Sequence, residues 1–145
     1  MNMTGMAISK NNTDEVQVRI QLCREKRAST IDLSDLGLSH FPDEIKDMKH
    51  LRSINVSENN LTELPDYIDS YSYLECLDIS YNKLLSLPDA IGNLGSLEQL
   101  NVRCNELTAI PQAIGKLTML NSLDISYNQL STLPDIFDNL SRLEY

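Results

Sequence analysis

The chain has 145 residues, 41% of them hydrophobic, which suits one domain with a continuous core. Its formal net charge of −9 argues against nucleic acid and anionic membranes as the main partners, because both attract surfaces rich in lysine and arginine. We therefore expect a protein partner of basic or mixed charge.

The sequence shows no sign of a membrane or secretory segment. The first letters, MNMTGMAISKNNTDE, lack the basic start and long apolar stretch of a signal peptide, and no apolar run is long enough to cross a membrane. Cys23, Cys76 and Cys104 have neither the number nor the spacing of a disulfide framework or a zinc site. These features favour a cytoplasmic protein with free thiols and no metal or other cofactor. If the chain is a bacterial effector that is injected into a host cell, we expect it in the cytosol of the host.

The N-terminal part contains a candidate cap. Residues 1–12 are expected to be disordered, and residues 13–27 precede the first repeat. Val16, Val18, Ile20 and Leu22 alternate as in a strand, whereas Val16, Ile20 and Cys23 recur at helical spacing. We favour a helix for this cap.

From residue 28 onward the chain repeats itself every 23 residues. LDISYN occurs at 77–82 and at 123–128, and the similar INVSEN and LNVRCN occupy 54–59 and 100–105. The units span 28–50, 51–73, 74–96, 97–119 and 120–142, with a partial unit at 143–145. Such a period predicts a domain built from stacked repeats.

Each unit keeps its apolar residues at fixed places. In the third unit they are Leu74, Leu77, Ile79, Leu84, Leu87, Ile91 and Leu94. The alternation at the start of the unit predicts a short strand with one buried face. A single unit cannot bury all these side chains, so the units must stack and their strands must form a parallel sheet.

The pattern LxxLxLxxNxLxxLPxxIxxLxx resembles the intracellular leucine-rich repeat and is similar to the Ras-group and Ras-scaffold leucine-rich repeat proteins. The resemblance implies an α/β repeat fold, a leucine-rich repeat solenoid whose parallel sheet lines the concave face, here preceded by an N-terminal helical cap. It also implies binding rather than chemistry, as in an adaptor or scaffold for signalling.

A second, shorter resemblance leaves an alternative open. The stretch RIQLCREKRASTIDLS resembles the lead-in to the repeats of a leucine-rich repeat ubiquitin ligase. The chain would then be the substrate-recognition part of a ubiquitin ligase or bacterial effector whose catalytic domain lies elsewhere.

Asparagine holds the ninth place of four units, where the chain turns inward after the strand. An amide there can bond backbone groups of its own and the adjacent turn, so we expect a structural column. Its members are Asn59, Asn82, Asn105 and Asn128. The prolines at the fifteenth place are expected to belong to the scaffold as well.

The candidate binding residues occupy the third, fifth, seventh and eighth places, which are predicted to point outward from the strands. Tyr81 and Tyr127 share one column two units apart, about 9 to 10 Å at the usual strand spacing, with Arg103 between them. Tyrosine and arginine are enriched at binding hot spots. The predicted partner-binding residues are Tyr81, Tyr127, Arg103, Asp78, Glu58, Asp124, Asp32 and Asn101. The alternative is that this face is plain solvent surface.

No catalytic site is expected. Cys104 is the one plausible nucleophile, and it would need a histidine as a base. His40 and His50 both lie in the first unit and beyond its strand segment, so neither should reach Cys104.

The last unit is followed by no polar cap. Its interior layer would contain Leu120, Leu123, Ile125, Leu130, Leu133 and Phe137, beside an open strand edge. Either the natural chain is longer or this edge meets a partner, and our hypothesis is a homodimer formed through the edge. A third reading is a self-associating structural repeat protein.

Overall fold

A computed structural model of the chain describes residues 12–144, and it begins with the helix α1, Asn12–Lys26. The helix prediction is confirmed. Val16, Ile20 and Cys23 are its buried residues. The helix ends at Lys26, because the next residue, Arg27, has a left-handed φ of 47°, and the Ala28 N–H donates to the Cys23 carbonyl oxygen over 3.0 Å. Apart from Asn12, which lies in the helix, the segment expected to be disordered is outside the described residues.

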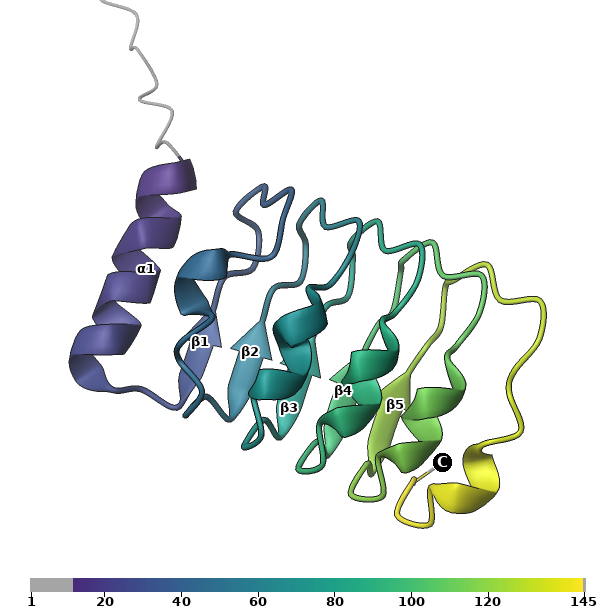
Figure 1. Cartoon of the computed structure of the whole chain (residues 1–145). Helices are drawn as coiled ribbons and strands as arrows, with labels where there is room; N and C mark the ends of the chain where they lie inside the picture. Colours follow the sequence, from purple (N-terminus) through teal and green to yellow (C-terminus); the bar gives the residue numbers. More distant parts are fainter. Residues whose placement is uncertain (1–11, 145) are drawn as a thin grey trace, which may run out of the picture.

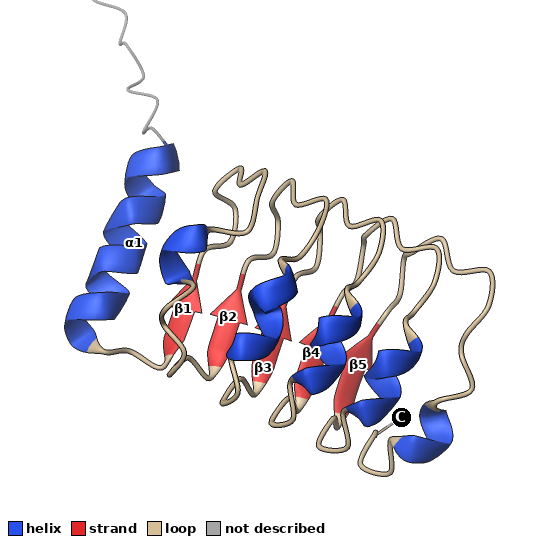
Figure 2. Ribbon diagram, viewed as in Figure 1, coloured by secondary structure: helices blue, strands red, loops and turns tan. Residues whose placement is uncertain are grey.

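The parallel sheet predicted from the repeats is also confirmed. Its strands pair in chain order, and each residue lies beside the residue 23 positions further on, as Ile54 lies beside Leu77. Figures 1 and 2 show α1 flanking β1 at one end of the sheet and the C-terminus at the other. The strands are β1 (Thr30–Asp32), β2 (Ser53–Asn55), β3 (Cys76–Asp78), β4 (Gln99–Asn101) and β5 (Ser122–Asp124).

Short 3-10 helices form the side opposite the sheet (Figure 2). Each of the first four follows a proline in an extended conformation, whose missing N–H suits a segment outside any strand ladder. Gly92 of η3 lies so close to the Ala113 backbone of η4 that a Cβ would clash. These helices are η1 (Asp43–Ile45), η2 (Asp66–Ser70), η3 (Asp89–Asn93), η4 (Gln112–Lys116) and η5 (Phe137–Asn139).

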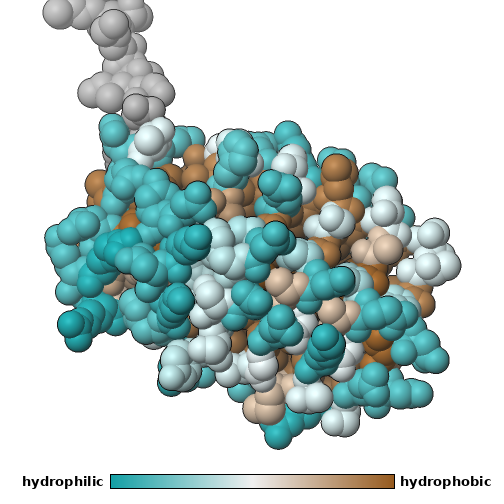
Figure 3. All heavy atoms as spheres, in the orientation of Figure 1, coloured by the Kyte–Doolittle hydropathy of each residue, from teal (hydrophilic) through white to brown (hydrophobic). Residues whose placement is uncertain are grey.

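One continuous core joins α1 to the last repeat. In the third unit Leu74, Ile79 and Leu84 have no exposed surface, because the units on both sides cover them. The fifth unit is covered on one side. Leu123 and Ile125 are therefore half-buried, and Leu133 is 52% exposed. Figure 3 shows hydrophobic surface at this end, whereas the α1 end is mainly hydrophilic. Among residues 12–144, no helix is long and apolar enough to cross a membrane.

Candidate functional site

The asparagines at the ninth place tie neighbouring repeats together. Asn82 accepts a hydrogen bond from the Leu61 N–H over 2.9 Å, and its amide donates to the carbonyl oxygens of Val56, Ile79 and Ser80 over 3.0 to 3.1 Å. Asn59, Asn105 and Asn128 make the corresponding bonds to the repeat before their own. The column keeps the turn after each strand rigid, so the residues around the turn are held in place.

The fifth-place residues begin this turn. The Oδ1 atoms of Asp78 and Asp124 accept from the backbone N–H two residues on, over 2.9 Å, and from its serine hydroxyl over 2.6 Å. Asn101 accepts from the Arg103 N–H in the same way, over 3.1 Å. These predicted contact residues therefore also stabilise the scaffold, with the carboxylates using one oxygen for the turn.

The seventh-place serines correct the expected pattern. They were predicted to point outward, but Ser57 and Ser80 are only 7% and 4% exposed. The Ser80 hydroxyl turns back to the Asp78 carboxylate instead of facing solvent. Arg103 takes this place in the fourth unit, where its long side chain reaches the surface.

Hydrogen bonds from the serines also keep two carboxylates charged. The Ser126 hydroxyl lowers the pKa of Asp124 below its ordinary value, and the Ser34 hydroxyl does the same to the pKa of Asp32. Both side chains thus carry a negative charge at neutral pH.

The two tyrosines occupy an uncommon backbone conformation. Tyr81 and Tyr127 have φ values of 52° and 54°, in the left-handed region that costs residues other than glycine free energy. Their side chains are 50% and 70% exposed. The corresponding residues Asp35, Glu58 and Cys104 share this conformation, so the turn of the repeat imposes it.

Arg103 joins the two tyrosines into one cluster. Its guanidinium lies 4.2 Å from the centre of the Tyr127 ring, a cation–π contact, and its Nη1 donates to the Ser126 hydroxyl over 2.9 Å. A hydrogen bond with Tyr81 raises the pKa of Arg103 above its ordinary value. Asp124 lies 3.9 Å from the same guanidinium. The structure thus brings together four residues that the sequence singled out.

A hollow of about 430 Å³ lies over the strands next to this cluster. Its lining comes from the third to fifth places of β2, β3 and β4 and from the third and fifth places of β5, and it includes Asp78, Asn101 and Asp124. It also includes Cys76 and Gln99, whose Sγ and Oε1 are 3.6 Å apart. The sequence placed these two on the outward face but did not select them. Their third place in the repeat, which is predicted to point outward, was the sequence feature that could have identified them.

Two predicted contact residues lie apart from the cluster. Asp32 is at the end of the sheet, where Arg19 of α1 donates to its carbonyl oxygen over 3.1 Å and lies 3.9 Å from its carboxylate. Glu58 is exposed, one repeat before Tyr81 in the same column. We take the Tyr81–Arg103–Tyr127 cluster and the adjoining hollow as the candidate site.

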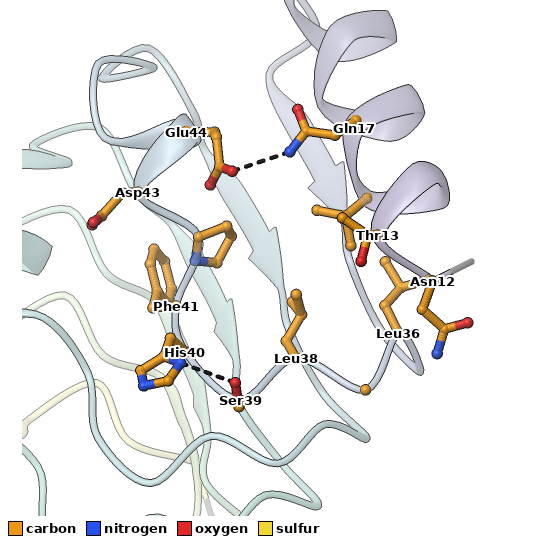
Figure 4. A pocket seen from close by; sticks show the side chains of 13 residues that line it. Asn12, Thr13, Gln17, Leu36, Leu38, Ser39, His40, Phe41, Asp43 and Glu44 are labelled. Atoms are coloured by element: carbon orange, nitrogen blue, oxygen red, sulfur yellow. Dashed lines mark hydrogen bonds between the residues drawn. The ribbon is translucent and has the colours of Figure 1, made fainter.

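A second hollow, of about 520 Å³, lies between the start of α1 and the first repeat (Figure 4). A bond of 3.0 Å from Gln17 to Glu44 crosses from the helix to the repeat. Leu36 replaces asparagine in this unit, and Gly37 follows with a φ of 67°. A Cβ at Gly37 would come within 3.3 Å of the Asn12 amide nitrogen. This hollow therefore results from the atypical junction between helix and repeats.

The structure shows the surroundings of the Cys76 thiol and of the two histidines, His40 and His50. Burial raises the pKa of the Cys76 thiol, which favours its unreactive protonated form. His40 lies 2.9 Å from the Ser39 hydroxyl and His50 lies 3.1 Å from the Ala28 carbonyl oxygen, so both bond groups far from Cys104 in the chain. Within residues 12–144, no three His, Cys, Asp or Glu side chains are grouped to hold a metal ion.

A family model and a solved structure point to the same family. The leucine-rich repeat family model matches residues 49–107 and 95–145. A leucine-rich repeat protein of Leptospira interrogans shares 32% identity with a TM-score of 0.71, and the match covers 74% of this chain and 28% of that one. No curated protein gave a significant match.

Two other solved structures are similar. A plant ice-binding protein shares 35% identity over 62% of this chain and 30% of its own, with a TM-score of 0.56. An internalin of Listeria monocytogenes shares 21% identity over 72% of this chain and 30% of its own, with a TM-score of 0.60, and this likeness concerns the fold. The chain spans less than a third of the length of these three proteins.

Domains of this kind generally serve as protein–protein interaction modules. The period of 23 residues, the parallel sheet and the family match all support the same assignment. The chain belongs to the leucine-rich repeat family.

Proposed function

We propose that the chain is a non-enzymatic adaptor or scaffold that binds a protein partner on the face of its sheet. The observation that carries the proposal is the Tyr81–Arg103–Tyr127 cluster. Two well-exposed tyrosines, each on the turn of its own repeat and both next to one arginine, are the residue types and the preorganised arrangement on which binding energy concentrates.

The charge of this face suggests the kind of partner. The outward places of the five units contain the acids Asp32, Asp35, Glu58, Asp78 and Asp124, against a single cation, Arg103. A partner of basic or mixed charge fits such a surface, because opposite charges speed association and exclude acidic competitors.

We place this role in the cytoplasm, in signalling. Cys23, Cys76 and Cys104 are free thiols, as expected in a reducing compartment. The alternative is that the same surface recognises substrates for a ubiquitin ligase or bacterial effector whose catalytic domain lies elsewhere. The matched proteins are much longer than this chain, which is compatible with this alternative.

A second proposal is a homodimer formed through the exposed edge of the last repeat. It is supported by Leu133, which is 52% exposed, and by the half-buried Leu130 and Phe137 beside it. Burying these side chains against another copy would remove apolar surface from water.

The test of the main proposal is a partner isolated from lysate and identified by mass spectrometry. We expect Tyr81→Ala with Tyr127→Ala to weaken its binding at least about 30-fold, the size of a hot-spot loss of about 2 kcal/mol. The control is Tyr73→Ala, another exposed tyrosine, which lies just before β3. Equal binding by the double variant and the control would refute the proposal.

A further inference from the structure

The spacing of the two tyrosines matches one particular peptide conformation. Tyr81 and Tyr127 belong to the third and fifth units, two strands apart, which is about 9.6 Å at a strand spacing of about 4.8 Å. A polyproline II helix has three residues per turn and rises about 3.1 Å per residue, so one turn is about 9.3 Å long. One turn of such a peptide therefore spans the two tyrosines.

The acidic column on the same face has the same period. Asp32, Asp78 and Asp124 are each two strands apart, and asparagines stand between them at 55 and 101. In a polyproline II peptide every third residue faces the same side, whereas in an extended strand positions three apart face opposite sides. A row of basic side chains at every third position would thus meet the carboxylates in register.

The carboxylates retain capacity for such a contact. Asp78 and Asp124 use Oδ1 for the turn, while the Oδ2 of Asp78 accepts a hydrogen bond of 3.3 Å from the Asn101 amide and the Oδ2 of Asp124 lies 3.9 Å from Arg103. The hollow of about 430 Å³ lies over these two acids. A guanidinium from a partner can bond Oδ2 without disturbing the turn.

The tyrosines supply the other half of the surface. Grooves lined by aromatic side chains are a recurring way to bind proline-rich segments, because the peptide is already ordered and its rings pack on the aromatic faces. Cys104 occupies the same column between Tyr81 and Tyr127, and Arg103 beside it lies over the Tyr127 ring, so the prolines would pack on the surface that the two rings still expose.

We infer that this face binds a polyproline II segment of a partner that carries an arginine or lysine at every third position. The segment runs across the strands, with its basic side chains toward the Asp78–Asp124 column and its prolines against Tyr81 and Tyr127. The inference rests on the proposed function and specifies the partner for that site.

The test compares two labelled peptides of identical composition, RPPRPPRPP and RPRPRPPPP, by fluorescence anisotropy at about 150 mM salt, where long-range charge attraction is screened. We expect RPPRPPRPP to bind at least tenfold more tightly, because its arginines share one side of the helix. The peptide EPPEPPEPP is expected not to bind.

Two protein variants locate the binding. Asp78→Asn with Asp124→Asn removes both charges but keeps the turn, because Asn55 and Asn101 already make the same turn bond over 2.9 and 3.1 Å. This variant and Tyr81→Ala with Tyr127→Ala should each lose at least tenfold in affinity for RPPRPPRPP, while Tyr73→Ala should keep it.

Equal binding of the two arginine peptides would overturn the inference, since charge alone would then explain the affinity. Absence of binding, with the isolated partner still lost by the tyrosine variant, would overturn the inference and leave the proposed function standing. Retention of that partner by the tyrosine variant would refute both.

Discussion

At the scale of single residues, the place that stabilises the fold and the place proposed to bind a partner are adjacent in the same turn. The ninth place is buried and fully bonded, as at Asn82, whereas the eighth place is exposed, as at Tyr81. The free-energy cost of the left-handed φ at Tyr81 is offset by the bonds of the asparagine that follows it. A change at the eighth place can therefore alter binding with little effect on folding.

Replacement of Asn82 by alanine tests whether the ninth place stabilises the fold. It leaves the Leu61 N–H without its buried acceptor and removes one of the two hydrogen bonds that each of three carbonyl oxygens accepts, so the free energy of unfolding should fall by about 2 to 4 kcal/mol. Urea unfolding measures the change. Asn128→Ala should cost less because Asn128 is only half-buried, and the exposed Asn60→Ala should cost almost nothing. Similar losses for all three variants would contradict the account.

At the scale of elements, α1 closes the core at the first repeat. Val16, Ile20 and Cys23 pack against it, while Val18 and Leu22 on the other side of the helix are 59% and 47% exposed. The helix thus covers apolar surface that a preceding repeat would otherwise cover.

Because α1 covers the core with one side only, substitutions on its two sides should differ in their effect on the free energy of unfolding. Ile20→Ala removes a side chain that is 3% exposed, so it should lower the free energy of unfolding by about 2 to 4 kcal/mol. Val18→Ala on the exposed side should change it by less than about 0.5 kcal/mol. Thermal unfolding of both variants measures the difference, and comparable losses would show that α1 does not seal the core.

The sequence alone predicted the strands and their stacking, because the apolar residues recur at fixed intervals in every repeat. The alternation of Leu77 and Ile79 with polar residues predicted the strands, and their 23-residue spacing predicted the register. The bonds between side chains of adjacent repeats were not predictable. Whether Ser80 turns back to Asp78, or Arg103 lies over Tyr127, depends on side-chain rotamers that no spacing specifies.

At the scale of the whole molecule, the repeats are covered at the α1 end and exposed at the β5 end. Leu133 is 52% exposed there, whereas Leu87 at the same place of the third unit is 6% exposed. If two copies meet through this edge, the chain should sediment as a dimer at high concentration, and Leu133→Lys should make it monomeric. Leu85→Lys, at another exposed leucine (58%), is the control. A monomer at all concentrations would rule out the homodimer.

The central claim is that the face bearing Tyr81, Arg103 and Tyr127 is where the partner binds. The most direct measurement follows the backbone amide signals of the chain by NMR during titration with the isolated partner. The account predicts the largest shifts at Tyr81, Arg103, Tyr127 and the residues of β3 to β5, with little change in α1 and in the 3-10 helices. Shifts confined to α1 or to the 3-10 helices would contradict it.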